Sequence, residues 1–133
     1  MNWTKLIFFG VFYIGIGTIG ITIPMGLNGP VIEDIAIGLV TIVISTAGYA
    51  STEKILMLQS EKCTKLEILL NMALPFIFFL STVFVAISIS NGHKNLPLSI
   101  AITTYVISCA FWWYQNRDNK NFEDYTGPLG GKI

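Results

Sequence analysis

Charge is what this sequence has least of. Only 12% of its 133 residues are charged, which is about half the share found in an ordinary soluble domain. Eight basic residues balance eight acidic ones, so the net charge is zero and no global field would attract nucleic acid. No charged residue lies near the middle of a long apolar run, which argues against a proton pump that works through a buried carboxylate.

Cysteine and histidine are scarce as well. Cys63 and Cys109 are too few and too far apart in the chain for a disulfide scaffold or a metal motif, and His93 is the only histidine. The chain has no suitably placed Ser/His/Asp set, no glycine-rich phosphate loop and no paired carboxylates within an apolar run. We therefore expect no catalytic site, no cofactor and no metal, and we expect that the protein is not an enzyme.

Long apolar runs, in contrast, make up most of the chain. Apolar residues account for 53% of the sequence and gather in four blocks, at about residues 6–23, 31–50, 66–90 and 96–114. Each block is long enough to cross a hydrocarbon layer of about 30 Å as a helix. The sequence predicts an all-α membrane protein in which residues 1–115 form an up-down-up-down bundle of four transmembrane helices, followed by a flexible tail at 116–133.

Turn and cap residues predict where the first two helices end and begin. Pro24 and the turn at residues 26–30 are expected to end the first helix, and Asn28 is expected to cap the second. Glu33 and Asp34 then fall in the first turn of the second helix, where the positive end of the helix dipole favours acidic side chains.

The connector at residues 51–65 separates the two halves of the bundle. Its first half, around residues 55–58, is expected to continue the second helix beyond the membrane surface. Thr64 and Glu67 form a capping box directly before the third apolar block. Pro75, inside that block, is expected to kink or locally open the third helix.

The distribution of lysine and arginine predicts the orientation. One side of the predicted bundle holds only Lys94, and the other holds all remaining basic residues: Lys5, Lys54, Lys62, Lys65, Arg117, Lys120 and Lys132. By the positive-inside rule, both termini and the connector are cytoplasmic. We expect the protein to lie in the bilayer of a bacterial cytoplasmic (inner) membrane.

Stripes of small residues follow one face of the first, second and fourth helices. In the second helix, Gly38, Thr41, Ser45 and Gly48 repeat at steps of three, four and three. Such stripes allow close helix packing in lipid, and we prefer packing to a pore-lining role for them. Because three helices carry small faces, and four helices leave little room for a path through one subunit, we expect self-association into a homo-oligomer.

Four polar residues are candidates for facing a pore or cavity: Asp34, Thr41, Ser45 and Asn71. For Asp34 the alternative is that it only stabilises the start of a helix, and the sequence favours that alternative. For Asn71, close to Pro75, the simpler alternative is a hydrogen bond between helices.

Two functions from different classes fit this pattern. The one we favour is a non-enzymatic membrane subunit that docks a cytosolic protein through the connector and tail, such as the membrane component of a bacterial phage-defence or toxin-immunity system. The docking candidates are Lys54, Glu61, Lys62, Lys65, Phe122 and Tyr125. The alternative is a small homo-oligomeric channel or transporter for an ion or small solute.

Overall fold

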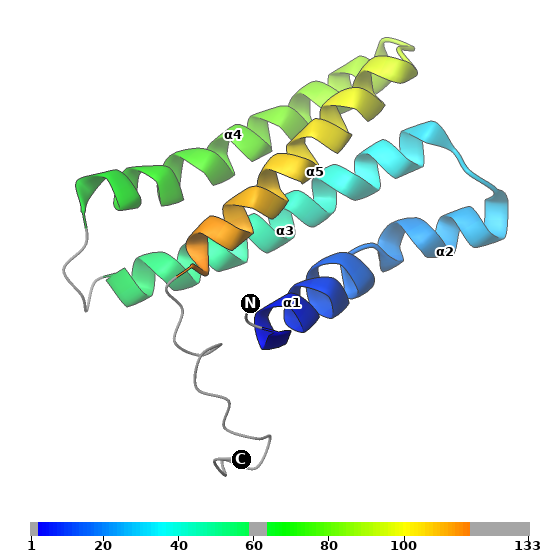
Figure 1. The fold of residues 1–133 in the computed structure, drawn as a ribbon. Coiled ribbons are helices and arrows are strands. Elements are labelled where there is room, and N and C mark those ends of the chain that lie inside the picture. Colours follow the sequence, from blue (N-terminus) through cyan, green and yellow to red (C-terminus); the bar gives the residue numbers. More distant parts are fainter. Residues whose placement is uncertain (1–2, 59–63, 118–133) are drawn as a thin grey trace.

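A computed structural model of the chain describes residues 3–58 and 64–117, and every regular element within these residues is a helix. Three segments follow one another to form what we term the first rod: α1 (Trp3–Phe8), the π-helix η1 (Phe9–Ile16) and α2 (Ile19–Asn28). They are followed by α3 (Ile32–Leu58), α4 (Lys65–Ser90) and α5 (Asn95–Gln115). The first rod and the three long helices run in alternate directions (Figure 1). The prediction of an all-α fold is confirmed for the described residues.

The first rod is bent at Gly17 and Thr18. Its two halves, Lys5–Ile16 and Ile19–Leu27, meet at an angle of 41°. η1 has the wide turn of a π-helix. The Gly17 N–H donates to the carbonyl of Phe12, five residues earlier, at 3.2 Å. The Thr18 hydroxyl donates to the Ile14 carbonyl at 2.7 Å. An inserted π turn followed by Gly-Thr accounts for the bend.

Two predictions about the first turn region are wrong. Pro24 does not end the first helix, because α2 continues through it to Asn28, although the helix does end within the predicted turn at residues 26–30. Asn28 is therefore the last residue of α2 rather than the cap of α3. The stop comes instead at Gly29, whose φ of +78° is a conformation that glycine adopts without steric cost. Gly92, with a φ of +77°, turns the chain between α4 and α5 in the same way.

Local signals around the connector give the expected result. α3 extends to Leu58, so the helical first half of the connector is confirmed. The capping box is present: the Glu67 N–H donates to the Thr64 hydroxyl at 3.3 Å, and the Thr64 N–H donates to the Glu67 carboxylate at 3.3 Å. α4 then runs through Pro75 to Ser90 without an interruption in its helix.

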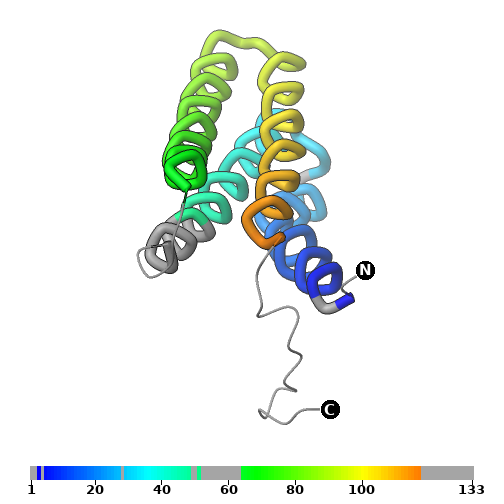
Figure 2. Tube along the Cα trace, turned by 60° about the vertical axis from the view of Figure 1, so that its left-hand side comes forward, coloured from blue at the N-terminus to red at the C-terminus, as the bar shows by residue number. Residues whose placement is uncertain are grey.

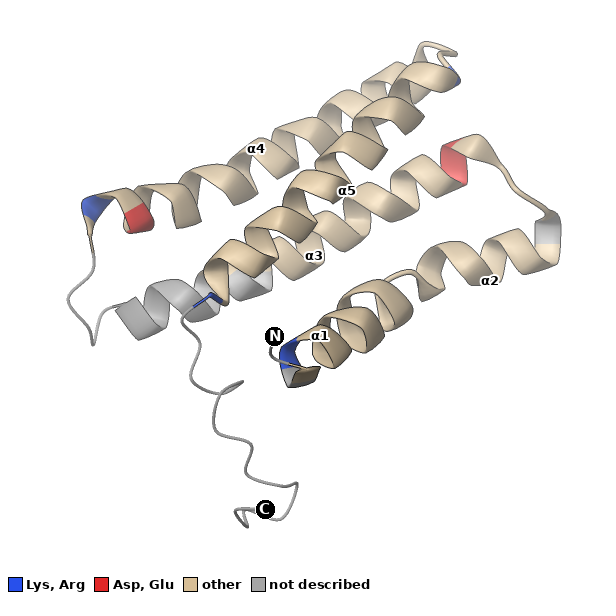
Figure 3. Ribbon diagram, viewed as in Figure 1, with Lys and Arg blue, Asp and Glu red and all other residues tan. Residues whose placement is uncertain are grey.

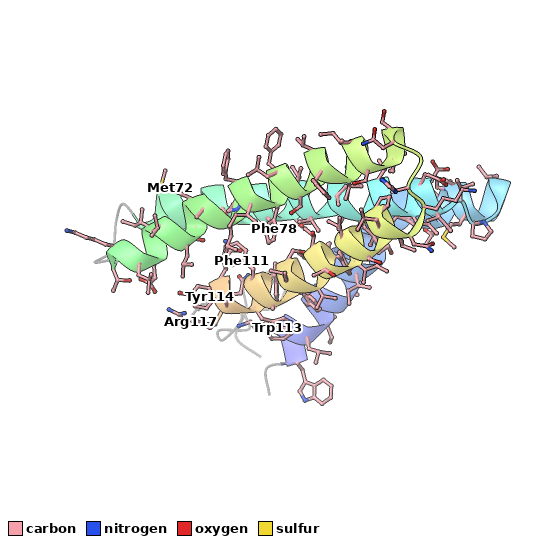
Figure 4. All side chains as sticks on the ribbon, turned by 90° about the horizontal axis from the view of Figure 1, so that it is seen from above. Met72, Phe78, Phe111, Trp113, Tyr114 and Arg117 are labelled. Carbon is pink, nitrogen blue, oxygen red and sulfur yellow. The ribbon has the colours of Figure 1, made fainter. Side chains whose placement is uncertain are left out.

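Helices α3, α4 and α5 pack around a common interior. Near the loop that joins α2 to α3, Ala36, Val40, Val85 and Ala101 form one buried cluster. Farther along, Val43, Ala47, Phe78 and Phe111 form a second. Phe78 and Phe111 point toward each other from α4 and α5, with ring centroids 6.2 Å apart (Figure 4). Figure 2 shows α4 and α5 side by side, joined by the short turn at residues 91–94.

The small-residue face of α5 lies inside this single chain. Ala101, Thr104 and Ser108 are all buried. The expectation of a homo-oligomer depended partly on that face needing a partner, and the face already has one. Self-association remains a prediction, now without the support of the fourth helix.

The outside of the bundle is apolar and its charges lie at the ends. On α4 alone, large exposed side chains include Leu69, Met72, Phe76, Phe79 and Phe84, and Figure 4 shows Met72 directed away from the other helices. The charged residues whose side chains are described lie at two ends, which we term the terminal end (Lys5, Lys65, Glu67, Arg117) and the turn end (Glu33, Asp34, Lys94) (Figure 3).

This distribution reverses the usual pattern of a soluble bundle, in which apolar side chains face inward and charges cover the sides. Helices α4 and α5 are long and apolar enough to cross a membrane, and the two halves of the first rod make a third candidate if they count as one span.

Candidate functional site

A groove with a volume of about 610 Å³ lies between the first rod and α3. The first rod contributes one wall, with Gly17, Gly20 and Pro24. The wall from α3 is longer and consists of Asp34, Ile37, Gly38, Thr41, Ile42, Ser45 and Thr46. The volume is within the range of about 300–1,000 Å³ that is typical of small-molecule sites.

Three of the four residues that the sequence marked as pore-facing candidates meet in this groove. Asp34, Thr41 and Ser45 all line it and are all exposed. The sequence led us to expect that any path would need several subunits, whereas this groove is formed by one chain. The groove lies beside the 41° bend of the first rod, since Gly17 at the bend is one of its lining residues, and no pattern of apolar residues predicts that bend.

Glycines decide where the two walls touch and where they stay apart. A Cβ added to Gly38 would collide with the Ile21 side chain, so α2 and α3 make their close contact there. A Cβ added to Gly20 would meet nothing within 4 Å. Gly20 therefore keeps space open in the groove, and its lack of a side chain is not needed for packing.

The hydroxyl groups of the groove are bonded to their own helix. Thr41 donates to the Ile37 carbonyl at 2.8 Å, Ser45 to the Thr41 carbonyl at 2.9 Å, and Thr46 to the Ile42 carbonyl at 2.7 Å. Such bonds satisfy a hydroxyl proton inside an apolar environment. They leave the oxygen lone pairs as the polar feature that each side chain can offer to a ligand.

A second polar contact joins the first rod to α5. The Tyr13 and Ser108 hydroxyls are 2.6 Å apart and buried, and the Ser108 hydroxyl lies 2.9 Å from the Tyr105 carbonyl. Around this pair, Phe9 packs on Trp112 with ring centroids 5.0 Å apart. Tyr13 and these aromatic contacts hold η1 against α5.

Asn71 lies elsewhere, in a buried polar cluster near the terminal end. Its amide oxygen accepts a bond of 2.8 Å from the Gln115 amide nitrogen, which also lies 3.1 Å from the Ser51 hydroxyl. All three side chains are at most 5% exposed. Asn71 thus makes the interhelical hydrogen bond that was its simpler interpretation, and it does not line the groove.

Ser51 and Gln115 were not singled out from the sequence. They are separated by 64 residues, and no local pattern links them. Their positions in the sequence could have pointed to them. Ser51 and Gln115 each lie at the end of an apolar run, at the same end of the predicted bundle as the start of the run that contains Asn71. The Gln115 carbonyl oxygen, Oε1, is buried without a hydrogen-bond partner in the described part of the chain.

Ionic contacts tie the ends of the helices together beyond this cluster. Arg117 pairs with Glu67 at 2.7 Å and lies over the Tyr114 ring at 4.3 Å. Lys5 donates to the carbonyl of Asn116, and its ammonium group lies 5.3 Å from the centroid of the Trp113 ring. The positive charge of Lys5 also interacts favourably with the negative, C-terminal end of the α5 helix dipole.

The docking candidates are mostly beyond what the structure describes. Lys65 is the first residue of α4 and is exposed. Lys54 belongs to α3, but its side chain is not described. Glu61, Lys62, Phe122 and Tyr125 lie outside the described residues. The structure therefore does not test whether the docking candidates form one surface.

Comparison with known proteins finds no match to this chain among family models, curated proteins or solved structures.

Proposed function

We propose that the protein is a four-span membrane protein that binds a small solute in the groove and carries it across the bilayer, as a transporter or channel. The observation that supports this proposal is the meeting of Asp34, Thr41 and Ser45 opposite the glycines of a bent helix. In membranes, irregular helix geometry and intramembrane polar groups are typical of sites that contact a transported solute.

In this proposal α3 is the fourth span. It has 27 residues, a length of about 40 Å at 1.5 Å per residue, and residues 35–52 contain no charged side chain. The terminal end, with the excess of basic residues, faces the cytoplasm by the positive-inside rule. The turn end, where Asp34 lies, then faces outward, so the groove is entered from outside.

Docking of a cytosolic partner through residues 51–65 and the tail remains a second proposal. It concerns segments that are largely undescribed, and the groove neither requires nor excludes it. The groove favours the transport proposal because its candidate residues are described and meet in one place.

Blocking the groove tests the transport proposal. Gly20→Leu is expected to fill it without disturbing the fold, since space around Gly20 is open. Gly10→Leu is the matched control, because Gly10 is equally open but does not line the groove. Proteoliposomes are loaded with (2-naphthylmethyl)trimethylammonium or naphthalene-2-sulfonate, two permanently charged fluorescent solutes that cross lipid slowly.

Wild type and Gly10→Leu are expected to release at least one of these solutes faster than empty vesicles do. Gly20→Leu should reduce this release at least about tenfold, a loss of about 1.4 kcal/mol or more. Two results would show that the groove is not a transport route. One is that the protein never releases a solute faster than empty vesicles do, and the other is that Gly20→Leu and Gly10→Leu release it equally fast.

A further inference from the structure

We propose that the groove selects monovalent organic cations with an apolar body, with Asp34 as the countercharge. This inference rests on the proposed function and names the class of solute that the site takes. It is drawn from the chemical character of the atoms that the groove presents.

The polar side chains that line the groove can offer hydrogen-bond acceptors. Thr41 and Ser45 have already donated their protons to helix carbonyls, so their oxygens offer lone pairs. Pro24 has no N–H to donate to the Gly20 carbonyl one turn earlier, and both residues line the groove. The Asp34 carboxylate is an acceptor as well.

Within residues 3–58 and 64–117, no lysine, arginine or histidine lines the groove, and the Asp34 carboxylate forms no ion pair or side-chain hydrogen bond. A carboxylate in a groove that has no cationic side chain repels an anion and offers that anion no side-chain donor. A cation, in contrast, gains attraction to the Asp34 carboxylate. One unpaired carboxylate matches one positive charge.

The remaining lining requires an apolar body. Ile37 and Ile42 present hydrocarbon, and Gly17, Gly20 and Gly38 add no polar side-chain atom. A small, strongly hydrated ion gains nothing from this hydrocarbon and finds only a few acceptors to replace any water that it gives up. An organic cation keeps its charge near Asp34 at the turn end and buries its hydrocarbon farther in.

The chain provides a matched pair of carboxylates for the test. Glu33 and Asp34 are neighbours in the first turn of α3, and only Asp34 lines the groove. Asp34→Asn removes the proposed countercharge, and Glu33→Gln removes an equal charge one residue away. Comparing these variants separates a groove charge from the general charge of the turn end.

The experiment measures binding to the full chain in nanodiscs, by equilibrium dialysis at low salt, for three probes that share a naphthalene core. The probes are (2-naphthylmethyl)trimethylammonium, 2-naphthalenemethanol and naphthalene-2-sulfonate, with empty nanodiscs subtracted. We expect the cation to bind about fivefold more tightly than the neutral alcohol, as for a partly solvated charge pair, and the sulfonate to bind more weakly than either.

Asp34→Asn should remove the preference for the cation over the alcohol, while Glu33→Gln should keep most of this preference. Equal binding of the cation and the alcohol, or equal effects of the two variants, would overturn the inference while leaving a groove that binds neutral solutes. If Gly20→Leu weakened the binding of none of the three probes, both the inference and the proposed function would be overturned.

Discussion

Replacing Phe78 with alanine is expected to lower the free energy of unfolding by about 3 kcal/mol. Phe78 is 2% exposed and lies in the cluster that joins α3, α4 and α5, edge-on to Phe111. In the bilayer that we propose for this protein, lipid is as apolar as this interior, so the loss would come mainly from the cavity and the missing contacts rather than from transfer out of water. The midpoint of SDS-induced unfolding, followed by tryptophan fluorescence, measures it.

Phe79 provides the control for this substitution. It is the next residue in α4 and is 52% exposed, so Phe79→Ala should change stability by less than about 1 kcal/mol. If the two variants unfolded at the same SDS concentration, the assignment of inward and outward faces on α4 would be wrong.

Gly17→Ala is expected to cost about 1–3 kcal/mol in stability and to reduce binding in the groove. A Cβ at this position would collide with the backbone carbonyl of Tyr13 and approach Ile42 on α3 to 3.4 Å. The backbone between Tyr13 and Gly17 must therefore rearrange, which changes the bend and moves α2 relative to α3. SDS unfolding and dialysis with the naphthyl cation measure the two effects.

Gly10→Ala should behave differently. The added Cβ meets nothing within 4 Å, and alanine is the better helix former by up to about 1 kcal/mol. We therefore expect unchanged or slightly greater stability and normal binding. A Gly17→Ala protein with the stability and affinity of Gly10→Ala would show that the bend does not depend on that glycine.

The parts of this fold that follow from neighbouring residues were predictable. The Thr64–Glu67 capping box is a local pattern and forms as expected. The all-helical fold follows from long apolar runs, because backbone groups in such runs are satisfied within a helix. The preference for packing along the small-residue stripe of the second block holds at Gly38, which meets Ile21. It is wrong for Thr41 and Ser45, which are exposed and line the groove.

The features that determine the candidate site were less predictable. The sequence predicts a helix end at Pro24 and a kink or local opening at Pro75. Both helices continue through these prolines, and the bend occurs at Gly17 and Thr18 instead. A π turn has no distinct sequence signature, because the competition between i+4 and i+5 bonding depends on packing against other helices. The site candidates on α3 could be identified, but the groove in front of them could not.

Long-range polar contacts were unpredictable for a different reason. Gln115 reaches Ser51 and Asn71 across 64 and 44 residues. A sequence shows that each of these residues is polar, but which of them share a buried layer depends on the register of three packed helices. Asn71 could be assigned a hydrogen bond between helices, but its partner could not be named.

The most direct test of the groove is its accessibility to water at mid-membrane depth. In a background with both native cysteines replaced by alanine, Ser45→Cys places a thiol in the groove, and Val106→Cys places one near the middle of α5, 60% exposed on the apolar surface. Intact cells are treated with a membrane-impermeant maleimide, and modification is measured by mass shift.

We predict that the thiol at position 45 is modified at least about tenfold faster than the one at 106, since thiolate forms in water and not in lipid. Adding Gly20→Leu should abolish the difference. Equal, slow modification of both thiols in intact cells would contradict a groove that opens from the turn end on the outer side of a membrane.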